Sequence, residues 1–133
     1  MAIQLSVAVR TARLDPIEST IGTGAHLRIY TGSAPADCAA AASGTNIVDM
    51  TLASDWMNAA SSGSKTKLGT WSGTGIGGGG VAGYFRIWDS AISACGLQGT
   101  CGIGSGDLQM DNTNIANGQV VTISTFTLTD ANA

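Results

Sequence analysis

From residue 27 onward, short runs of alternating apolar and polar residues are separated by turn sequences. Such alternation is typical of strands with one buried and one exposed face. There are about seven runs, and turn signals recur about every 8–12 residues, as in antiparallel sandwiches. No helical segments alternate with the runs, as a parallel sheet would require. The sequence therefore predicts a mainly β fold, an antiparallel β-sandwich of about seven strands over residues 27–128.

Turn residues set the boundaries of these runs. The pair Asn117-Gly118 is a strong signal for a tight turn. Segment 73–80 holds six glycines, too many for a strand interior, and is expected to form a flexible hairpin loop. The expected strands are 27–30, 48–52, 65–72, 81–89, 95–101, 107–111 and 119–128.

The last run contains an irregularity in its apolar pattern. Val121 and Ile123 share one parity, whereas Phe126 and Leu128 share the other. A β-bulge near Ser124-Thr125 would bring both pairs to one face. Alternatively, both faces of this strand are covered.

Residues 1–22 form an arm that precedes the sandwich, and their pattern is ambiguous. Leu14, Ile17 and Ile21 follow helical spacing, and the helical interpretation is favoured over most of the segment. Strand alternation is carried by four residues, Ile3, Leu5, Val7 and Val9.

Two helix starts are compatible with this segment. Asp15-Pro16-Ile17-Glu18 offers a cap, a proline in the first turn and a glutamate three residues after the cap. A longer helix from about Ser6 would instead carry Pro16 inside it and kink there. Gly22 is a natural stop in either case. No linker or long repeat divides the 133 residues, so a single domain is expected.

Charged residues are scarce, at 11% of the chain, and the net charge is −3. Binding to nucleic acid depends on clustered Lys and Arg, and only Lys65 and Lys67 lie close together. No apolar run reaches the length of a membrane span, and the first residues lack the pattern of a signal peptide. We therefore expect neither nucleic acid nor membrane as a partner, and a surface dominated by neutral Thr, Ser, Asn and Gly.

No catalytic constellation is evident, so the chain is not expected to be an enzyme. Residues 73–78 match the letters of a dinucleotide-binding loop, but no helix is expected after them. A serine triad would have to use His26, the single histidine, which a surface or edge position explains better. Asp107 and Asp111 could bind calcium, although hydrogen bonds from their side chains to nearby backbone groups in turns explain them better. We expect no catalytic residue, cofactor or metal.

The cysteines are better explained as small apolar side chains that pack inside the fold than as metal ligands. Cys95, Leu97 and Cys101 share strand parity, and three cysteines cannot all pair within one chain. No Cys-x-x-Cys pair occurs. Free thiols facing inward are expected.

Two kinds of segment are expected to contact other subunits: the alternating N-terminal stretch 1–14 and the glycine-rich loop 73–80. Within 81–89, the Phe85 and Ile87 face is expected in the core. The opposite face carries an aromatic–Arg–aromatic stripe, which is typical of a core or a protein interface, and less so of a sugar-stacking platform together with Trp56 and Trp71. The candidate contact residues are Ile3, Leu5, Val7, Val9, Ile76, Tyr84, Arg86 and Trp88.

Six stretches of the chain are informative together: Met-Ala-Ile-Gln-Leu-Ser-Val-Ala-Val-Arg at 1–10, Leu-Arg-Ile-Tyr-Thr-Gly at 27–32, Ser-Asp-Trp-Met at 54–57, Gly-Thr-Trp at 69–71, Phe-Arg-Ile-Trp-Asp-Ser at 85–90 and Phe-Thr-Leu-Thr-Asp-Ala-Asn-Ala at the end. Through these stretches, and over its whole length, the chain resembles small structural proteins of tailed bacteriophages and prophages. Similar proteins have a continuous helix where Pro16 lies.

The resemblance implies a virion protein that is assembled in the host cytoplasm. We expect a capsid decoration or cement protein that contacts capsid proteins and other copies of itself. A tail or neck component is the first alternative. A receptor-binding or carbohydrate-binding module is the second.

Overall fold

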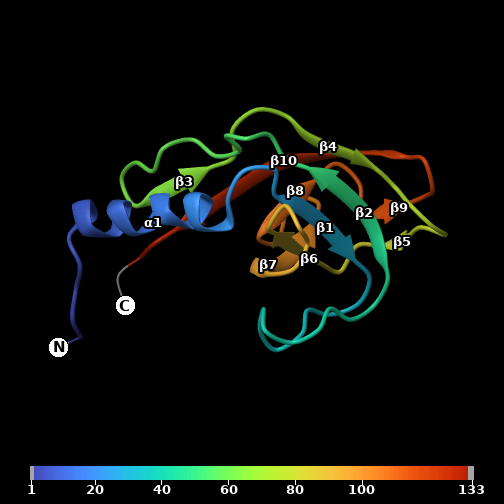
Figure 1. Ribbon diagram of the computed structural model, residues 1–133, viewed down its shortest axis with the longest axis horizontal. Coiled ribbons are helices and arrows are strands. Elements are labelled where there is room, and N and C mark those ends of the chain that lie inside the picture. The colour runs from blue at the N-terminus through green and yellow to red at the C-terminus, as the bar shows by residue number, and fades with distance from the viewer. Residues whose placement is uncertain (1, 132–133) are drawn as a thin grey trace.

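The computed structural model describes residues 2–131 and confirms a mainly β fold with an N-terminal helix (Figure 1). Short strands dominate the chain after residue 25, as the alternating pattern predicts. The elements are α1 (Val7–Ile21), β1 (His26–Tyr30), β2 (Asn46–Thr51), β3 (Ser64–Thr66), β4 (Trp71–Thr74), β5 (Gly80–Val81), β6 (Tyr84–Trp88), β7 (Cys95–Gly102), β8 (Leu108–Met110), β9 (Asn114–Ile115) and β10 (Val120–Thr129).

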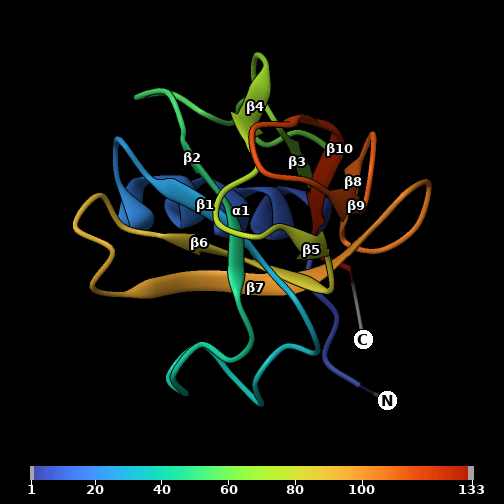
Figure 2. The ribbon, with the colours of Figure 1, turned by 90° about the vertical axis from the view of Figure 1, so that its right-hand side faces the viewer.

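Within the described residues, most strands belong to one sheet in the order β2-β1-β6-β7-β8-β10-β3, and β4 also pairs with β10. The sheet curls on itself (Figure 2). An isolated bridge between Val48 of β2 and Gly75, just after β4, joins its two sides. The two-residue strands β5 and β9 form a separate small sheet. We call the main structure the curled sheet.

The sheet is mixed, which corrects the expectation of a purely antiparallel one. Strands β7 and β8 pair in parallel, with Cys101 beside Leu108. The intervening loop doubles back through Gly104 and Gly106, whose φ angles of 65° and 82° suit glycine. A short loop thus replaces the helix that usually connects parallel strands.

The interior of the curled sheet holds the apolar core. Phe85 and Ile87 are almost completely buried, so the expected core face of β6 is confirmed. Phe85 makes an edge contact with Phe126, their ring centroids 5.6 Å apart. Trp56 and Trp71 also belong to this core, and they are therefore not part of an exposed sugar-stacking platform or interface.

Strand β10 contains the predicted bulge. Its register against β8 shifts between Ile123 and Thr125, and the intervening Ser124 is exposed. The extra residue changes the parity, so that Val121, Ile123 and Phe126 are all buried.

The expected strand 81–89 is instead divided. Val81 pairs with Asn114 in the small sheet, and the pairing with β1 and β7 begins at Tyr84. The division falls at Gly83, whose N–H donates to the carbonyl of Tyr30. A Cβ on Gly83 would lie 1.8 Å from the carbonyl oxygen of Gly32, so this close backbone approach requires glycine.

The expected hairpin between 65–72 and 81–89 does not form. Strand β4 extends into the glycine-rich segment and pairs with β10, whereas β3 pairs with the far end of β10. Gly73 allows this extension, because a Cβ there would lie 2.9 Å from the Cβ of Met50. The two halves of the expected strand 65–72 therefore pair with different parts of one long strand.

Helix α1 follows the longer of the two expected courses. Ser6 is its N-cap, with the side-chain oxygen accepting from the N–H of Val9 at 3.2 Å. The helix passes through Pro16 and ends at Gly22, whose N–H donates to the carbonyl of Glu18. Because proline has no N–H, the carbonyl of Ala12 loses its usual helical partner.

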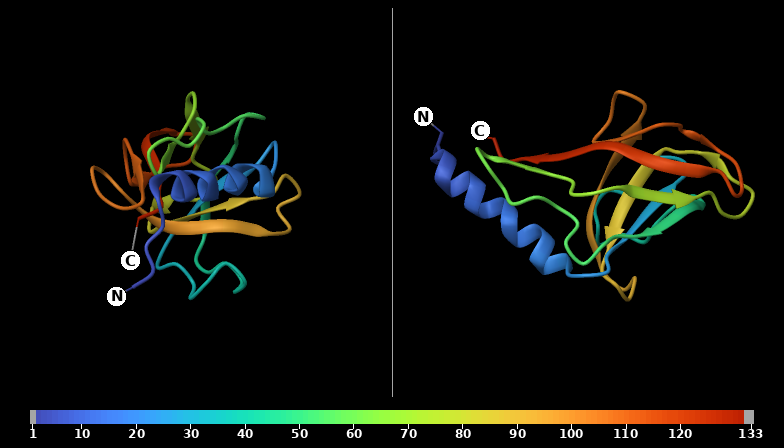
Figure 3. Two further views of the ribbon diagram at one scale, coloured as in Figure 1. Left: turned by 90° about the vertical axis from the view of Figure 1, so that its left-hand side faces the viewer. Right: turned by 90° about the horizontal axis from the view of Figure 1, so that it is seen from above.

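The helix lies beside β3 and extends past the curled sheet, toward the end of β10 (Figure 3). Arg10 donates from Nη1 to the carbonyl of Asp130 at 2.9 Å, and Arg13 forms an ion pair with the Asp130 carboxylate at 3.1 Å. Leu14 is buried, and Ile21 packs against Gly96, where a Cβ would lie 2.4 Å from it. These contacts hold the arm along the sheet.

Candidate functional site

The N-terminal candidate residues lie at and before the first turn of α1. Ile3 is 87% exposed, and Val7 and Val9 are 49% and 47% exposed. Leu5 is half-buried. The Ser6 cap fixes the start of the helix, so Val7 and Val9 are displayed from a defined position on its first turn, and Ile3 precedes the cap.

A second group of exposed apolar side chains lies at the other end of the molecule from α1, near the labels β5 and β9 in Figure 1. Ile76, in the loop after β4, is 37% exposed. Val81 of β5 and Val120 of β10 are 62% and 61% exposed. Of these three residues, only Ile76 was identified as a candidate from the sequence.

The stripe on the outer face of β6 is covered, as expected, but the cover is the chain's own segment 34–45. Arg86 is completely buried. Its Nη2 donates to the carbonyls of Asp37 and Ala40 at 3.1 and 2.9 Å, and its Nε donates to Oε1 of Gln98 at 3.0 Å.

The aromatic members of the stripe are held by the same segment and by β1. The Tyr84 hydroxyl donates to the carbonyl of Ser43 at 2.6 Å and accepts from its N–H at 2.9 Å. Tyr84 stacks on Tyr30 with ring centroids 4.9 Å apart. The half-buried Trp88 lies beneath the Arg86 guanidinium, which is 5.4 Å from its ring centroid.

This arrangement corrects the assignment of Tyr84 and Arg86 as subunit contacts. Neither side chain is accessible to another chain, because hydrogen bonds from segment 34–45 satisfy their polar groups and close over them. Only Trp88 retains exposed surface. The accessible members of the candidate set are therefore Ile3, Val7, Val9, Ile76 and Trp88, with Leu5 half-buried.

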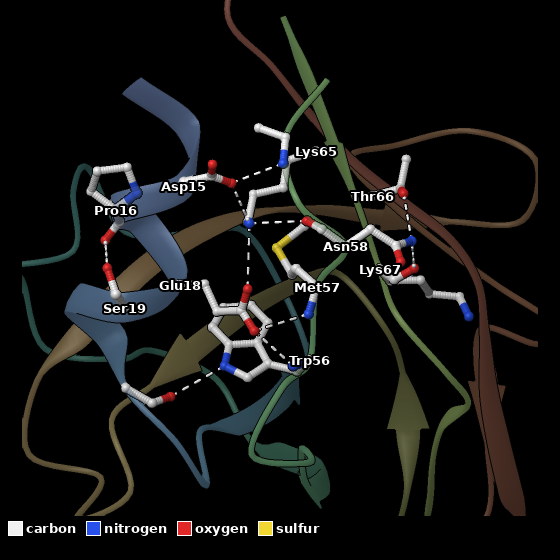
Figure 4. Close-up of polar contacts among 12 residues, drawn as sticks. Asp15, Pro16, Glu18, Ser19, Trp56, Met57, Asn58, Lys65, Thr66 and Lys67 are labelled. Carbon is white, nitrogen blue, oxygen red and sulfur yellow. Dashed lines mark hydrogen bonds and ion pairs between the residues drawn. The ribbon is translucent and has the colours of Figure 1, made fainter. Parts of the chain in front are cut away.

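A polar cluster beneath α1 was not predicted from the sequence (Figure 4). Lys65 of β3 is only 3% exposed. Its Nζ lies 2.9 Å from Oδ1 of Asp15, 3.4 Å from Oε2 of Glu18 and 3.0 Å from the carbonyl of Asn58. Helical spacing of Asp15 and Glu18, three residues apart, places both carboxylates on the same side of α1.

The same carboxylates fix the loop that precedes β3. Oε1 of Glu18 accepts from the backbone N–H groups of Trp56 and Met57 at 2.8 and 3.1 Å. Oδ1 of Asp15 accepts from the N–H of Ala60 at 2.8 Å; this bond, followed by the Lys65 contact, lowers the Asp15 pKa. Both carboxylates are thus engaged by the chain itself.

Asp55 is the remaining acid of this cluster, and it is exposed. Its hydrogen-bonding contact with Glu18 raises its pKa above the ordinary value, and desolvation acts in the same direction. An open pocket of about 630 Å³ lies over Asp55, Glu18 and Lys65. Because Lys65 and Glu18 are saturated by intrachain contacts, the arrangement suits attachment of the helix better than chemistry on a substrate.

Asp107 and Asp111, the acids that the sequence analysis considered for calcium, and Asp49 beside His26 all make contacts within the chain; Asp111 accepts from the N–H of Thr122 at 3.1 Å. Asp49 accepts from Nε of Arg28 at 2.9 Å and lies 2.8 Å from Nδ1 of His26. Asp107 accepts from the N–H and the hydroxyl of Thr100. Across residues 2–131, no group of three His, Cys, Asp or Glu side chains is arranged to hold a metal ion.

All three cysteines carry free, half-buried thiols. Cys101 packs against the core, and burial, followed by the nearby Asp107 charge, raises its pKa to about 12. Cys95 lies at the start of β7, and Cys38 lies in segment 34–45, whose sequence pattern did not predict its surroundings.

Comparisons with protein-family models, curated proteins and solved structures find no match to this chain. Within the described residues, no helix is both long enough and apolar enough to cross a membrane.

Proposed function

We propose that this chain is a structural protein of a tailed-phage virion, most specifically a decoration or cement protein that attaches to the outside of the capsid. The observation that carries the proposal is the exposed apolar N-terminal segment, with Ile3, Val7 and Val9 on either side of the Ser6 cap. Exposed apolar side chains grouped in this way are typical of surfaces that become covered by another protein.

The composition supports the same role. A neutral surface gives little electrostatic steering, so attachment relies on shape, backbone hydrogen bonds and apolar contacts that symmetry repeats many times. The second exposed group, at Ile76, Val81 and Val120, lies at the end of the molecule opposite α1. A subunit with apolar groups at two ends can contact the capsid with one and a neighbouring copy with the other.

The attachment is tested with particles of the phage that encodes this chain, using purified wild-type protein and the double variant Ile3→Ser/Val7→Ser. Burial of two such side chains contributes about 3 kcal/mol, so we expect the double variant to bind about 100-fold more weakly. Binding of the wild type should change little between about 0.05 and 0.5 M salt, because few ion pairs take part.

The matched control is Ile103→Ser, which removes a 60% exposed isoleucine from the β7–β8 loop. It should bind as the wild type does. Undiminished binding of the double variant, or release of the wild type by moderate salt alone, would contradict the proposed mode of attachment.

A further inference from the structure

Cys38 and Cys95 line the same pocket on the outer side of β6. This pocket, of about 590 Å³, is lined by residues 38–41 on one side and by Arg86, Trp88 and Cys95 on the other. The two cysteines are far apart in the sequence, yet the covering segment brings one over the strand that carries the other.

The backbone on both sides of Cys38 is held in place. The carbonyls of Asp37 and Ala40, which flank Cys38, both accept from Nη2 of the buried Arg86. Nε2 of Gln98 in β7 donates to the carbonyl of Pro35 at 2.8 Å, which adds a second anchor to the strand that begins at Cys95.

Cys95 is held on the neighbouring strand. It is the register partner of Trp88, whose ring lies under the Arg86 guanidinium. Desolvation first, and then the neighbouring Cys38 thiol, raises the pKa of Cys95 to about 12. The pair is therefore brought together by a network that does not include either sulfur.

We propose that Cys38 and Cys95 are a redox-sensitive pair that forms a disulfide within the chain by exchange with a small disulfide such as oxidised glutathione, and that this bond fastens segment 34–45 to β7. One thiolate attacks oxidised glutathione and releases the first glutathione. The second thiolate then attacks the mixed disulfide and releases another. The protein loses two protons and two electrons, and oxidised glutathione takes them up as it becomes two molecules of glutathione.

Such a bond would close a long loop between β1 and β7, and cross-links of long loops constrain the unfolded chain most. The oxidised protein should consequently melt at a higher temperature than the reduced one. Because the reactive species is the thiolate and the Cys95 thiol resists ionisation, oxidation should be slow near neutral pH and faster in alkaline buffer.

The test uses the full chain with Cys101→Ser, which leaves only the proposed pair. After incubation with excess oxidised glutathione at about pH 8.5, we expect both thiols to disappear, with a mass decrease of about 2 Da that corresponds to one disulfide. A peptide joining the segments around Cys38 and Cys95 should appear on digestion. Dithiothreitol should restore both thiols and the lower melting temperature.

The matched control, Cys38→Ser in the full chain, keeps Cys95 and Cys101 and should form no disulfide within the chain. Urea-unfolded Cys101→Ser protein shows that the reagent is active. Persistence of both thiols in the folded protein, a glutathione adduct on each, or disulfide-linked dimers would each overturn the proposal.

Discussion

Lys65 shows how a single side chain attaches the helical arm to the sheet. An ammonium group that is removed from water must be paired, and the partners here come from two places. Asp15 and Glu18 belong to α1, whereas the Asn58 carbonyl belongs to the loop before β3. The charge therefore links the arm to the strand pair formed by β3 and β10.

Replacement of this charge should weaken the folded state. Lys65→Met leaves the Glu18 carboxylate without its cation, and we expect a loss of about 3 kcal/mol in the free energy of unfolding. Lys67→Met is the matched control, because the Lys67 ammonium donates to the nearby Gly69 carbonyl in an exposed hydrogen bond and the backbone bonds of Lys67 are kept; it should change stability by no more than about 0.5 kcal/mol. Urea unfolding measures both, and equal effects would contradict this role for Lys65.

Asp55 and Asp89 should respond to pH with opposite signs. The folded-state pKa of Asp55 is raised above 3.8 by Glu18, so the wild type loses stability as pH rises through that raised value. Asp55→Asn should then melt at a higher temperature than the wild type at pH 7. The two proteins should converge below about pH 3.8, where Asp55 is protonated in both states.

Asp89 provides the opposite case. Its pKa is lowered by the Ser93 hydroxyl and by the N–H groups of Ala94 and Ser93. The stability that the Asp89 carboxylate adds to the folded protein is complete above pH 3.8, and it is lost as the pH falls through the lowered pKa. Asp89→Asn should thus melt below the wild type at pH 7 and approach it in acid. Thermal unfolding between about pH 2 and 7 compares the three proteins, and a lower melting temperature for Asp55→Asn at pH 7 would contradict the sign assigned to Asp55.

For single residues, the sequence pattern predicted which side chains of β6 would be buried or covered, but it did not predict which segment would cover them. Alternation alone placed Phe85 inside and Arg86 on the opposite face. The cover, segment 34–45, has no periodic pattern, because its backbone carbonyls rather than its side chains bind Arg86. The burial of Lys65 was likewise hidden, since it depends on carboxylates about fifty residues earlier in the chain.

Among the elements, features with a local cause were predictable. The parity change between Ile123 and Phe126 indicated either an extra residue or a strand covered on both faces, and the register of β10 shifts there. The break before β6 was not predictable, because it depends on the approach of Gly83 to Gly32, two positions without a local relationship. The double partnership of β10, with β4 at one end and β3 at the other, is similarly nonlocal.

Substitution of Gly83 tests this close approach. Gly83→Ala places a Cβ against the Gly32 carbonyl, and the required backbone shift should cost about 3 kcal/mol. Gly78→Ala is the matched control: nothing lies within 4 Å of its added Cβ, so the change should stay within about 0.5 kcal/mol. Chemical denaturation measures both, and a neutral Gly83→Ala would show that the two backbones are not held together.

For the whole molecule, the proposed function depends on which apolar side chains are buried and which remain exposed. The curled sheet and segment 34–45 bury the large apolar and aromatic side chains. Exposed apolar side chains are grouped at the two ends, at Ile3, Val7 and Val9 and at Ile76, Val81 and Val120, whereas Leu68 and Ile103 are exposed in other parts of the chain. The proposed attachment to a virion rests on these ends, because the remaining surface offers few charges for recognition.

The central claim is tested most directly by the number and location of copies of this chain in purified particles of the tailed phage to which the proposal assigns it. Quantitative mass spectrometry gives the copy number relative to the major capsid protein, and labelled antibody gives the position in electron micrographs. A decoration protein should be present in hundreds of copies, on the order of the number of capsid subunits, and over the whole head. Its absence from particles would contradict a virion role, and small multiples of six confined to the tail or neck would contradict decoration.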